Sequence, residues 1–359
     1  MRYRLPLLAL GGAALLAGMW AGLLRLGWAL PTVRAGLPAD HGPLMVSGFL
    51  GTLISLERAV ALAADRRWPY LAPLLAGLGS AVLVLGLPWP IGPALMAAGS
   101  LAMLAMFVVI VRAQPALHTA TMAAGAAAWL VGNVLWLAGA PFAVVAPLWI
   151  GFLVFTIAGE RLELSRVQRL SVWALRLFAA ACALLAATLL HVTFAGLRGA
   201  WLGPFGLGLL GVAAWLLRYD VARRTVRRAG LIRYTAAGLL TGYVWLGVSG
   251  VFWLLWGGRQ LAGPLYDAQL HSVLLGFVMA MVFAHAPIIM PAILSAPFRF
   301  RSALYAPVVA LHLGLLARIA GDLSGSSPLR SWGGLLNVLA VVLFVALIAW
   351  SRPGAAAEV

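Results

Sequence analysis

Apolar stretches long enough to cross a membrane follow one another along almost the whole of this chain. Hydrophobic residues make up 64% of its 359 residues and charged residues only 9%, whereas soluble domains carry about 25% charged residues. A membrane-spanning helix needs about 20 apolar residues, and proline, glycine and arginine clusters divide the chain into about twelve such stretches. The sequence therefore predicts an all-α, polytopic membrane bundle. The expected spans lie near residues 6–30, 41–64, 69–88, 91–113, 117–139, 142–162, 170–193, 199–218, 231–257, 267–290, 303–321 and 331–351.

No segment is long and polar enough to form a soluble domain, so residues 1–359 are expected to form a single integral membrane domain. The first apolar stretch follows Arg2 and Arg4 and resembles the core of a signal peptide. It is longer than such a core and no convincing cleavage site follows, so we expect it to remain as a membrane anchor. The one cysteine, Cys182, rules out an intrachain disulfide and a thiolate metal cluster.

The arginines predict the orientation of the chain, which contains no lysine. If the N-terminus is cytoplasmic, 19 of the 25 arginines lie at the inner face and six at the outer face. This asymmetry follows the positive-inside rule. It predicts both termini in the cytoplasm of a bacterial-type inner membrane, and it accounts for the net charge of +16 without a nucleic-acid partner. The basic run from Arg223 to Arg228 then serves as an inner-face anchor beside membrane lipid.

Three of the six histidines are expected at one level near the outer face. His41 opens the second span and His271 the tenth, both running inward, and His191 closes the seventh, which runs outward. Imidazole is the usual axial ligand of haem iron, and two imidazoles at one depth could hold a haem between helices. Small residues after His41 and His271 would let a flat macrocycle approach the backbone. They are Gly42, Ser47, Gly48 and Gly51 in the second span, and Ser272, Gly276 and Ala280 in the tenth.

A simpler interpretation applies to each histidine taken singly. His41 and His271 could be interfacial residues in contact with water. His118, His285 and His312 lie at other depths. For these three we expect interfacial or interhelical hydrogen bonds.

The segments around His41 and His271 resemble subunit I of the haem-copper oxidases. Residues 41–45 (HGPLM) are similar to the second-helix segment of that family, in which the histidine binds the low-spin haem. Residues 270–280 (LHSVLLGFVMA) are similar to its tenth helix, with His271 at the second position of a His-x-His pair. The resemblance implies a subunit I-like bundle whose low-spin b-type haem is ligated by His41 and His271.

Three departures from that family concern its oxygen-reducing centre. Gln269 stands where the family has the ligand of the high-spin haem, and residues 146–150 (APLWI) replace the motif that carries a copper ligand. His191 is followed by Val192 where the family has a His-His pair. The resemblance therefore leaves His191 as the candidate copper ligand and implies that oxygen reduction is lost. Whether the chain has any other enzymatic activity stays open.

The chain is closer in outline to the NnrS group, twelve-helix proteins that bind haem and copper and are associated with nitric oxide resistance. Residues 311–320 (LHLGLLARIA) are similar to their eleventh helix, which ends in an arginine, although the His-x-His-Glu-Met entry of that group is missing. Haem propionates at the outer face would need cationic partners, and Arg318 and Arg330 flank the connection there. The alternative is that both merely flank a loop with Asp322.

The remaining charged residues have ordinary structural interpretations. Asp40 and Asp267 stand at expected helix starts, so we expect helix caps. The pairs at 57–58 and 160–161, with Glu163, fall near inner helix ends, where ion pairing and snorkelling are expected.

The sequence as a whole predicts a haem-binding membrane protein with a bis-histidine b-type haem near the outer face. Six-coordinate haem suits one-electron transfer, so we expect a role in electron transfer or in a nitric oxide or redox response, with a redox partner at the outer face. A twelve-helix secondary transporter is the main alternative, because scattered intramembrane charges suit that class too. A purely structural or assembly role is the third. The oligomeric state stays open.

Overall fold

The computed structural model describes residues 3–62, 66–196, 202–294 and 298–351, and every regular element in these ranges is a helix. Eleven of the described helices are long and apolar enough to cross a membrane. A further helix, α9 (Gly203–Tyr219), has 17 residues. The predicted all-α, polytopic membrane bundle is therefore confirmed. The chain ends, 1–2 and 352–359, lie outside the described residues, and so does the prediction that both are cytoplasmic.

The chain divides into two compact units, Met1–Glu160 and Arg161–Val359. The boundary falls inside the helix α7 (Phe142–Ser165), which runs through it without a break. The prediction of a single membrane domain over residues 1–359 stays a prediction.

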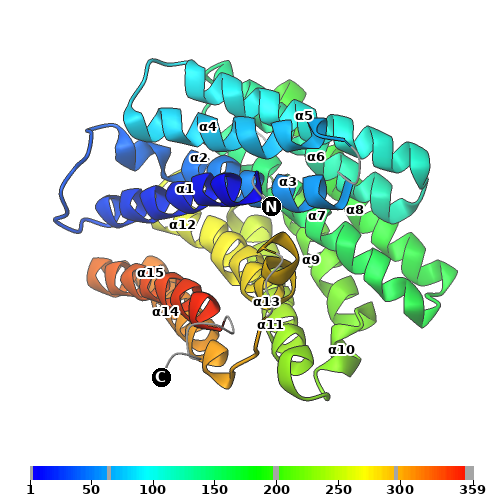
Figure 1. The fold of residues 1–359 in the computed structure, drawn as a ribbon. Coiled ribbons are helices and arrows are strands. Elements are labelled where there is room, and N and C mark those ends of the chain that lie inside the picture. Colours follow the sequence, from blue (N-terminus) through cyan, green and yellow to red (C-terminus); the bar gives the residue numbers. More distant parts are fainter. Residues whose placement is uncertain (1–2, 63–65, 197–201, 295–297, 352–359) are drawn as a thin grey trace, which may run out of the picture. The chain divides into compact units, whose positions relative to one another are not determined.

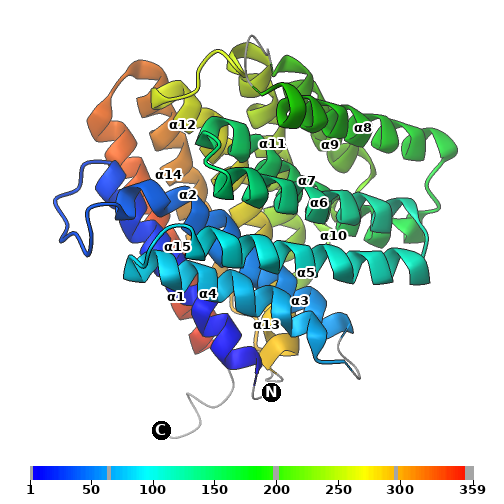
Figure 2. The ribbon, with the colours of Figure 1, turned by 90° about the horizontal axis from the view of Figure 1, so that it is seen from above.

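Unit 1 is built from antiparallel helices (Figure 1). The second long helix of this unit is interrupted by a π-helix. Its helices α4 and α5 lie side by side, as Figure 2 shows. Glycines make this approach close, since a Cβ added at Gly79 would lie 2.8 Å from the carbonyl oxygen of Gly92. The elements are α1 (Arg4–Arg25), η1 (Leu37–Asp40), α2 (His41–Pro43), the π-helix η2 (Leu44–Leu50), α3 (Gly51–Leu62), η3 (Trp68–Tyr70), α4 (Leu71–Leu85), α5 (Ile91–Ala113), α6 (Leu117–Leu137) and the first part of α7.

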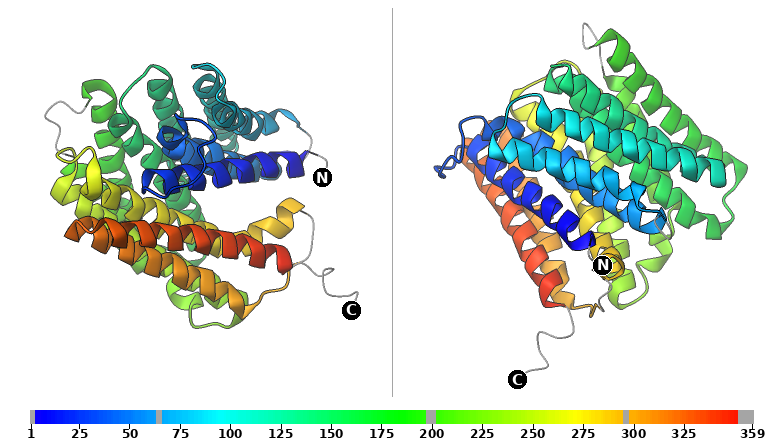
Figure 3. Two further views of the ribbon diagram at one scale, coloured as in Figure 1. Left: turned by 90° about the vertical axis from the view of Figure 1, so that its left-hand side faces the viewer. Right: turned by 45° about the horizontal axis from the view of Figure 1, so that its top comes forward.

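Unit 2 likewise contains a helix interrupted by a π-helix. Its last two long helices, α14 and α15, lie side by side along their length (Figure 3). A Cβ added at Gly333 would lie 2.6 Å from the carbonyl oxygen of Gly314, so only glycine permits this contact. The elements are η4 (Arg166–Gln168), α8 (Val172–Ala195), α9, α10 (Ala222–Thr225), α11 (Gly230–Trp256), α12 (Gly263–His271), the π-helix η5 (Ser272–Met279), α13 (Ala280–Leu294), η6 (Ser302–Leu304), α14 (Tyr305–Ser324) and α15 (Ser327–Trp350).

Asn133 on α6 is the polar centre of unit 1. Its side-chain oxygen accepts hydrogen bonds from the Ser47 hydroxyl at 2.7 Å and from the Trp149 indole at 3.0 Å. Its amide group donates to the carbonyl oxygen of Met96 at 3.2 Å. The Trp129 indole donates to the same Ser47 hydroxyl at 2.9 Å. One fully buried amide therefore joins η2, α5, α6 and α7.

Replacing Asn133 with alanine should lower the free energy of unfolding by about 2–3 kcal/mol, because the buried Ser47 hydroxyl and Trp149 indole would both lose a partner. Asn337→Ala is the matched control, since Asn337 donates one hydrogen bond, to the carbonyl oxygen of Leu311. Thermal unfolding in detergent should show a smaller loss for the control. Equal losses would contradict a central role for Asn133.

Candidate functional site

A π-helix follows each of the two histidines predicted as haem ligands. His41 is the first residue of α2, three residues before η2 begins, and His271 is the last residue of α12, directly before η5. Such wide turns are rare and are frequently found at functional sites. The sequence predicts helical spans here, near residues 41–64 and 267–290, and contains no pattern that indicates the π-helices.

His271 is held by Asp267, one helical turn earlier on the same face of α12. Its Nδ1 lies 3.0 Å from the carbonyl oxygen of Asp267 and 3.2 Å from the carboxylate oxygen Oδ1. Both atoms can only accept, so in the neutral ring Nδ1 carries the proton. Nε2 then carries the lone pair, which is the form in which an imidazole ligates a metal.

Asp267 is held in turn by Arg318 on α14. The guanidinium donates from Nε to one carboxylate oxygen at 2.7 Å and from Nη2 to the other at 2.8 Å. This bidentate geometry is the strongest form of the pair, and the Arg318 residue is only 8% exposed. Asp267 is not a helix cap, because α12 begins at Gly263 and its N-cap is Ala262. That prediction was wrong, since α12 starts one turn earlier than expected.

A second carboxylate lies beside this pair. Asp322 on α14 is close to both Asp267 and Arg318, and its side chain is fully buried. It forms an ion pair with Arg330, whose Nη1 is 3.9 Å away, and no N–H or O–H group of the described residues donates a hydrogen bond to either carboxylate oxygen. The two arginines predicted as propionate partners therefore each contact an aspartate of unit 2.

His41 is held against α1 in unit 1. Its Nδ1 lies 2.7 Å from the carbonyl oxygen of Gly18, so the same argument gives this ring a lone pair on Nε2. A Cβ added at Gly22 would lie 2.9 Å from the imidazole, so the ring packs directly on the backbone of α1. The preceding Asp40 forms an ion pair with Arg34 and no side-chain cap. Asp40 is thus the N-cap residue of α2, as predicted, but its side chain makes no capping hydrogen bond.

The small residues that follow the histidines are packed against protein side chains. A Cβ at Gly42 would lie 2.7 Å from the Phe142 ring, and one at Gly276 would lie 2.5 Å from the Trp245 ring. Gly48 and Gly51 are similarly filled from neighbouring helices. These glycines therefore serve close helix packing, and they do not support the expectation that a macrocycle approaches the backbone at these points.

His312 is fixed between helices of unit 2. The Trp245 indole donates to its Nδ1 at 3.1 Å, which leaves the proton on Nε2 to be donated to the Thr241 hydroxyl at 3.0 Å. The interhelical hydrogen bonding expected for His312 is confirmed. His285 has its Nδ1 3.0 Å from the carbonyl oxygen of Met281, and His118 is buried.

His191, the candidate copper ligand, is exposed on α8. Among the residues that the structure describes, no group of three or more histidine, cysteine, aspartate or glutamate side chains could hold a metal ion. Copper binding at His191 stays a prediction without companion ligands in the described chain.

Two adjacent residues of α7 form ion pairs, one partly buried in unit 1 and one buried in unit 2. Glu160 pairs with Arg58 in unit 1. Arg161 binds Asp220 in unit 2 with two hydrogen bonds, of 2.8 and 2.9 Å. The expected ion pairing at 57–58 and 160–161 is confirmed, whereas the sequence analysis did not identify Asp220 as the partner.

The match to known families covers both units. A family model described as a domain of unknown function, DUF8744, matches residues 4–353. The chain belongs to the DUF8744 family. No curated protein and no solved structure matches it. The DUF8744 match includes His41, His271 and every charged residue of the clusters described above.

Arg318→Met in this DUF8744 protein should lower the free energy of unfolding by about 3 kcal/mol, because it leaves the partly buried Asp267 carboxylate without its cation. The double variant Asp267→Leu with Arg318→Met removes both charges and should recover most of that loss. Chemical unfolding in detergent measures both.

Arg330→Met is the comparison for this cluster, since its 3.9 Å contact with Asp322 is longer and its side chain is partly exposed. Arg330→Met should lower the free energy of unfolding by less than Arg318→Met does. A double variant no more stable than Arg318→Met alone would contradict the pairing argument.

Proposed function

We propose that this protein is a redox protein of the membrane that binds b-type haem, with His271 and His41 as axial ligands. The proposal includes the predicted location in a bacterial-type inner membrane and a redox partner at the outer face. It extends to electron transfer or a nitric oxide or redox response, and to copper binding at His191.

The observation that carries this proposal is the relay from Arg318 through Asp267 to His271. Metal-ligating histidines almost always donate their second ring N–H to a carboxylate or a carbonyl oxygen, which fixes the tautomer and makes the ligand more basic. Nδ1 of His271 meets both kinds of acceptor on Asp267. The bidentate contact with Arg318 then fixes the orientation of the carboxylate.

His41 has the simpler form of the same support, a backbone carbonyl at 2.7 Å from Nδ1. When bound, haem would supply one-electron chemistry, and axial imidazoles set its potential. The residues of this chain would hold and orient the ligand rings. Arg318 already binds Asp267 through two donors, so Arg330 is the better of the two candidates for a propionate contact.

Ion-coupled transport is the second candidate, and Asp322 is the observation that favours it. Ionisable groups inside a membrane bundle commonly mark proton or ion pathways. The Asp322 side chain faces the Asp267 carboxylate, and no N–H or O–H group of the described residues donates a hydrogen bond to either oxygen of Asp322. A proton is the simplest occupant for such a group.

The haem proposal predicts α-band and Soret-band absorbance in a reduced-minus-oxidised spectrum of protein produced with ample haem. His271→Ala and His41→Ala should each reduce the haem content or convert the spectrum from low spin to high spin. His191→Ala is the matched control and should leave both unchanged, because this exposed ring lies on α8.

Asp267→Asn tests the support of His271 without removing the ligand itself. The asparagine side chain has the same size but no negative charge, so the haem should remain bound, with a more positive midpoint potential. Parent protein without haem bands, or bands unaffected by His271→Ala, would refute the assignment.

The transport candidate predicts proton flux into proteoliposomes under an imposed membrane potential, followed with an internal pH-sensitive dye. Asp322→Asn should reduce this flux at least about tenfold, since the amide cannot carry the proton. Asp40→Asn is the control outside the cluster, where the carboxylate pairs with Arg34. Equal flux in parent and Asp322→Asn liposomes would count against transport.

A further inference from the structure

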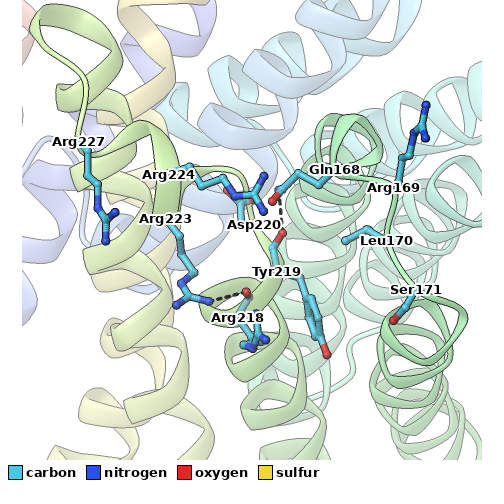
Figure 4. Close-up of a pocket in the computed structure, with 10 residues that line it drawn as sticks. All are labelled: Gln168, Arg169, Leu170, Ser171, Arg218, Tyr219, Asp220, Arg223, Arg224 and Arg227. Atoms are coloured by element: carbon cyan, nitrogen blue, oxygen red, sulfur yellow. Dashed lines mark hydrogen bonds between the residues drawn. The ribbon is translucent and has the colours of Figure 1, made fainter.

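A pocket of about 570 Å³ lies in unit 2, and five of its ten lining residues are arginines. Figure 4 shows that one wall comes from the chain that leads into α8 and the other from the end of α9 and the α10 segment. The lining residues are Gln168, Arg169, Leu170, Ser171, Arg218, Tyr219, Asp220, Arg223, Arg224 and Arg227.

The one carboxylate in the pocket wall does not neutralise these arginines. Both oxygens of Asp220 bind Arg161, which is not a lining residue. The oxygen Oδ1 also accepts from the backbone N–H of Ala222 at 2.6 Å. Asp220 is 1% exposed, so its charge is directed away from the cavity and anchors the start of α10.

One hydrogen bond joins the two walls, and another lies within the wall formed by α9 and α10. Arg223 donates to the carbonyl oxygen of Arg218 at 2.8 Å, and Gln168 donates to that of Tyr219 at 3.0 Å. The Arg218 guanidinium stacks over the Tyr219 ring at 5.2 Å. Both hydrogen bonds appear in Figure 4.

Three of the lining arginines keep their full donor capacity. Within the described ranges, the side chains of Arg169, Arg224 and Arg227 have no hydrogen-bond or ion-pair partner. Each carries five donors in a planar fork that matches phosphate oxygens. Ser171 caps the 24-residue helix α8 at the same wall, and the positive end of that helix adds to the field.

We propose that this pocket binds a phosphate group, carried either by an anionic lipid headgroup or by a soluble phosphate. A phosphate presents more acceptor oxygens than a carboxylate and carries one or two negative charges, so it can accept from several of the arginines that line the pocket. The pocket lies where α9 ends and α8 begins, at the ends of apolar helices, where a membrane protein meets headgroups. The site is independent of haem binding.

Two probes distinguish the sources of the phosphate. Delipidated protein in a neutral detergent is titrated with phosphatidylglycerol, using phosphatidylcholine as reference, and bound lipid is counted by native mass spectrometry. The same protein is titrated with inorganic phosphate by calorimetry. Saturable binding of one phosphatidylglycerol assigns a lipid headgroup, and saturable binding of inorganic phosphate assigns a soluble ligand.

The decisive variant is Arg224→Gln with Arg227→Gln, and its matched control is Arg228→Gln with Arg233→Gln. Both remove two charges from neighbouring positions, but Arg228 and Arg233 do not line the pocket. The pocket variant should bind at least about tenfold more weakly, because charge-assisted hydrogen bonds are lost. The control should change affinity by no more than about twofold.

Arg169→Gln tests the opposite wall and should also weaken phosphate binding. General attraction to the basic run from Arg223 to Arg228 would not explain that loss, because Arg169 lies outside this run. Elution volume and helical content check that each variant is folded. Equal losses in the pocket and control variants would overturn the proposal in favour of general surface attraction. So would a parent protein that binds neither probe better than the reference.

Discussion

The absence of water inside a bilayer is the constraint on which the rest of this structure depends. Backbone groups must be satisfied within each segment, so every regular element in the described part of the chain is a helix. The hydrophobic effect cannot hold such helices together in lipid, so small residues and polar contacts do so instead. The small residues are the glycines at the contacts between α4 and α5 and between α14 and α15. The polar contacts are those of Asn133 and the ion pair between Asp267 and Arg318.

The same constraint explains how much of the fold could be predicted from sequence. Span length and apolarity are local properties, so the all-α polytopic bundle followed from composition and from the spacing of proline, glycine and arginine. The π-helices η2 and η5 depend on how each helix packs against neighbouring helices, so no local sequence pattern predicted them. The cap predicted at Asp267 failed because α12 begins at Gly263, one turn before the expected start.

The candidate site could be predicted only in part. The two histidines stood out through their positions at span ends, but their partners come from elsewhere, and Arg318 is 51 residues from Asp267 along the chain. The spacing of four residues between Asp267 and His271 was visible in the sequence and would have suggested their contact. By contrast, the Arg161 and Asp220 pair joins positions 59 residues apart and required the structure. The basic run near Arg223 was seen, but its opposite wall, contributed by Arg169, was not.

Two partners share the charge of Asp267, and this sharing sets what the carboxylate can do for His271. Arg318 takes both oxygens at 2.7 and 2.8 Å, whereas Nδ1 of the imidazole stands 3.2 Å from one of them. The Arg318 guanidinium therefore neutralises much of the negative charge of Asp267, so the carboxylate polarises the His271 ring less. A fully charged carboxylate would draw the imidazole proton strongly and make Nε2 a very electron-rich donor. With Arg318 in place, Asp267 acts mainly by orienting the imidazole ring of His271, and it adds less electron density to Nε2. Such an arrangement would favour a histidine of fixed tautomer and moderate donor strength, which suits reversible one-electron chemistry better than substrate activation.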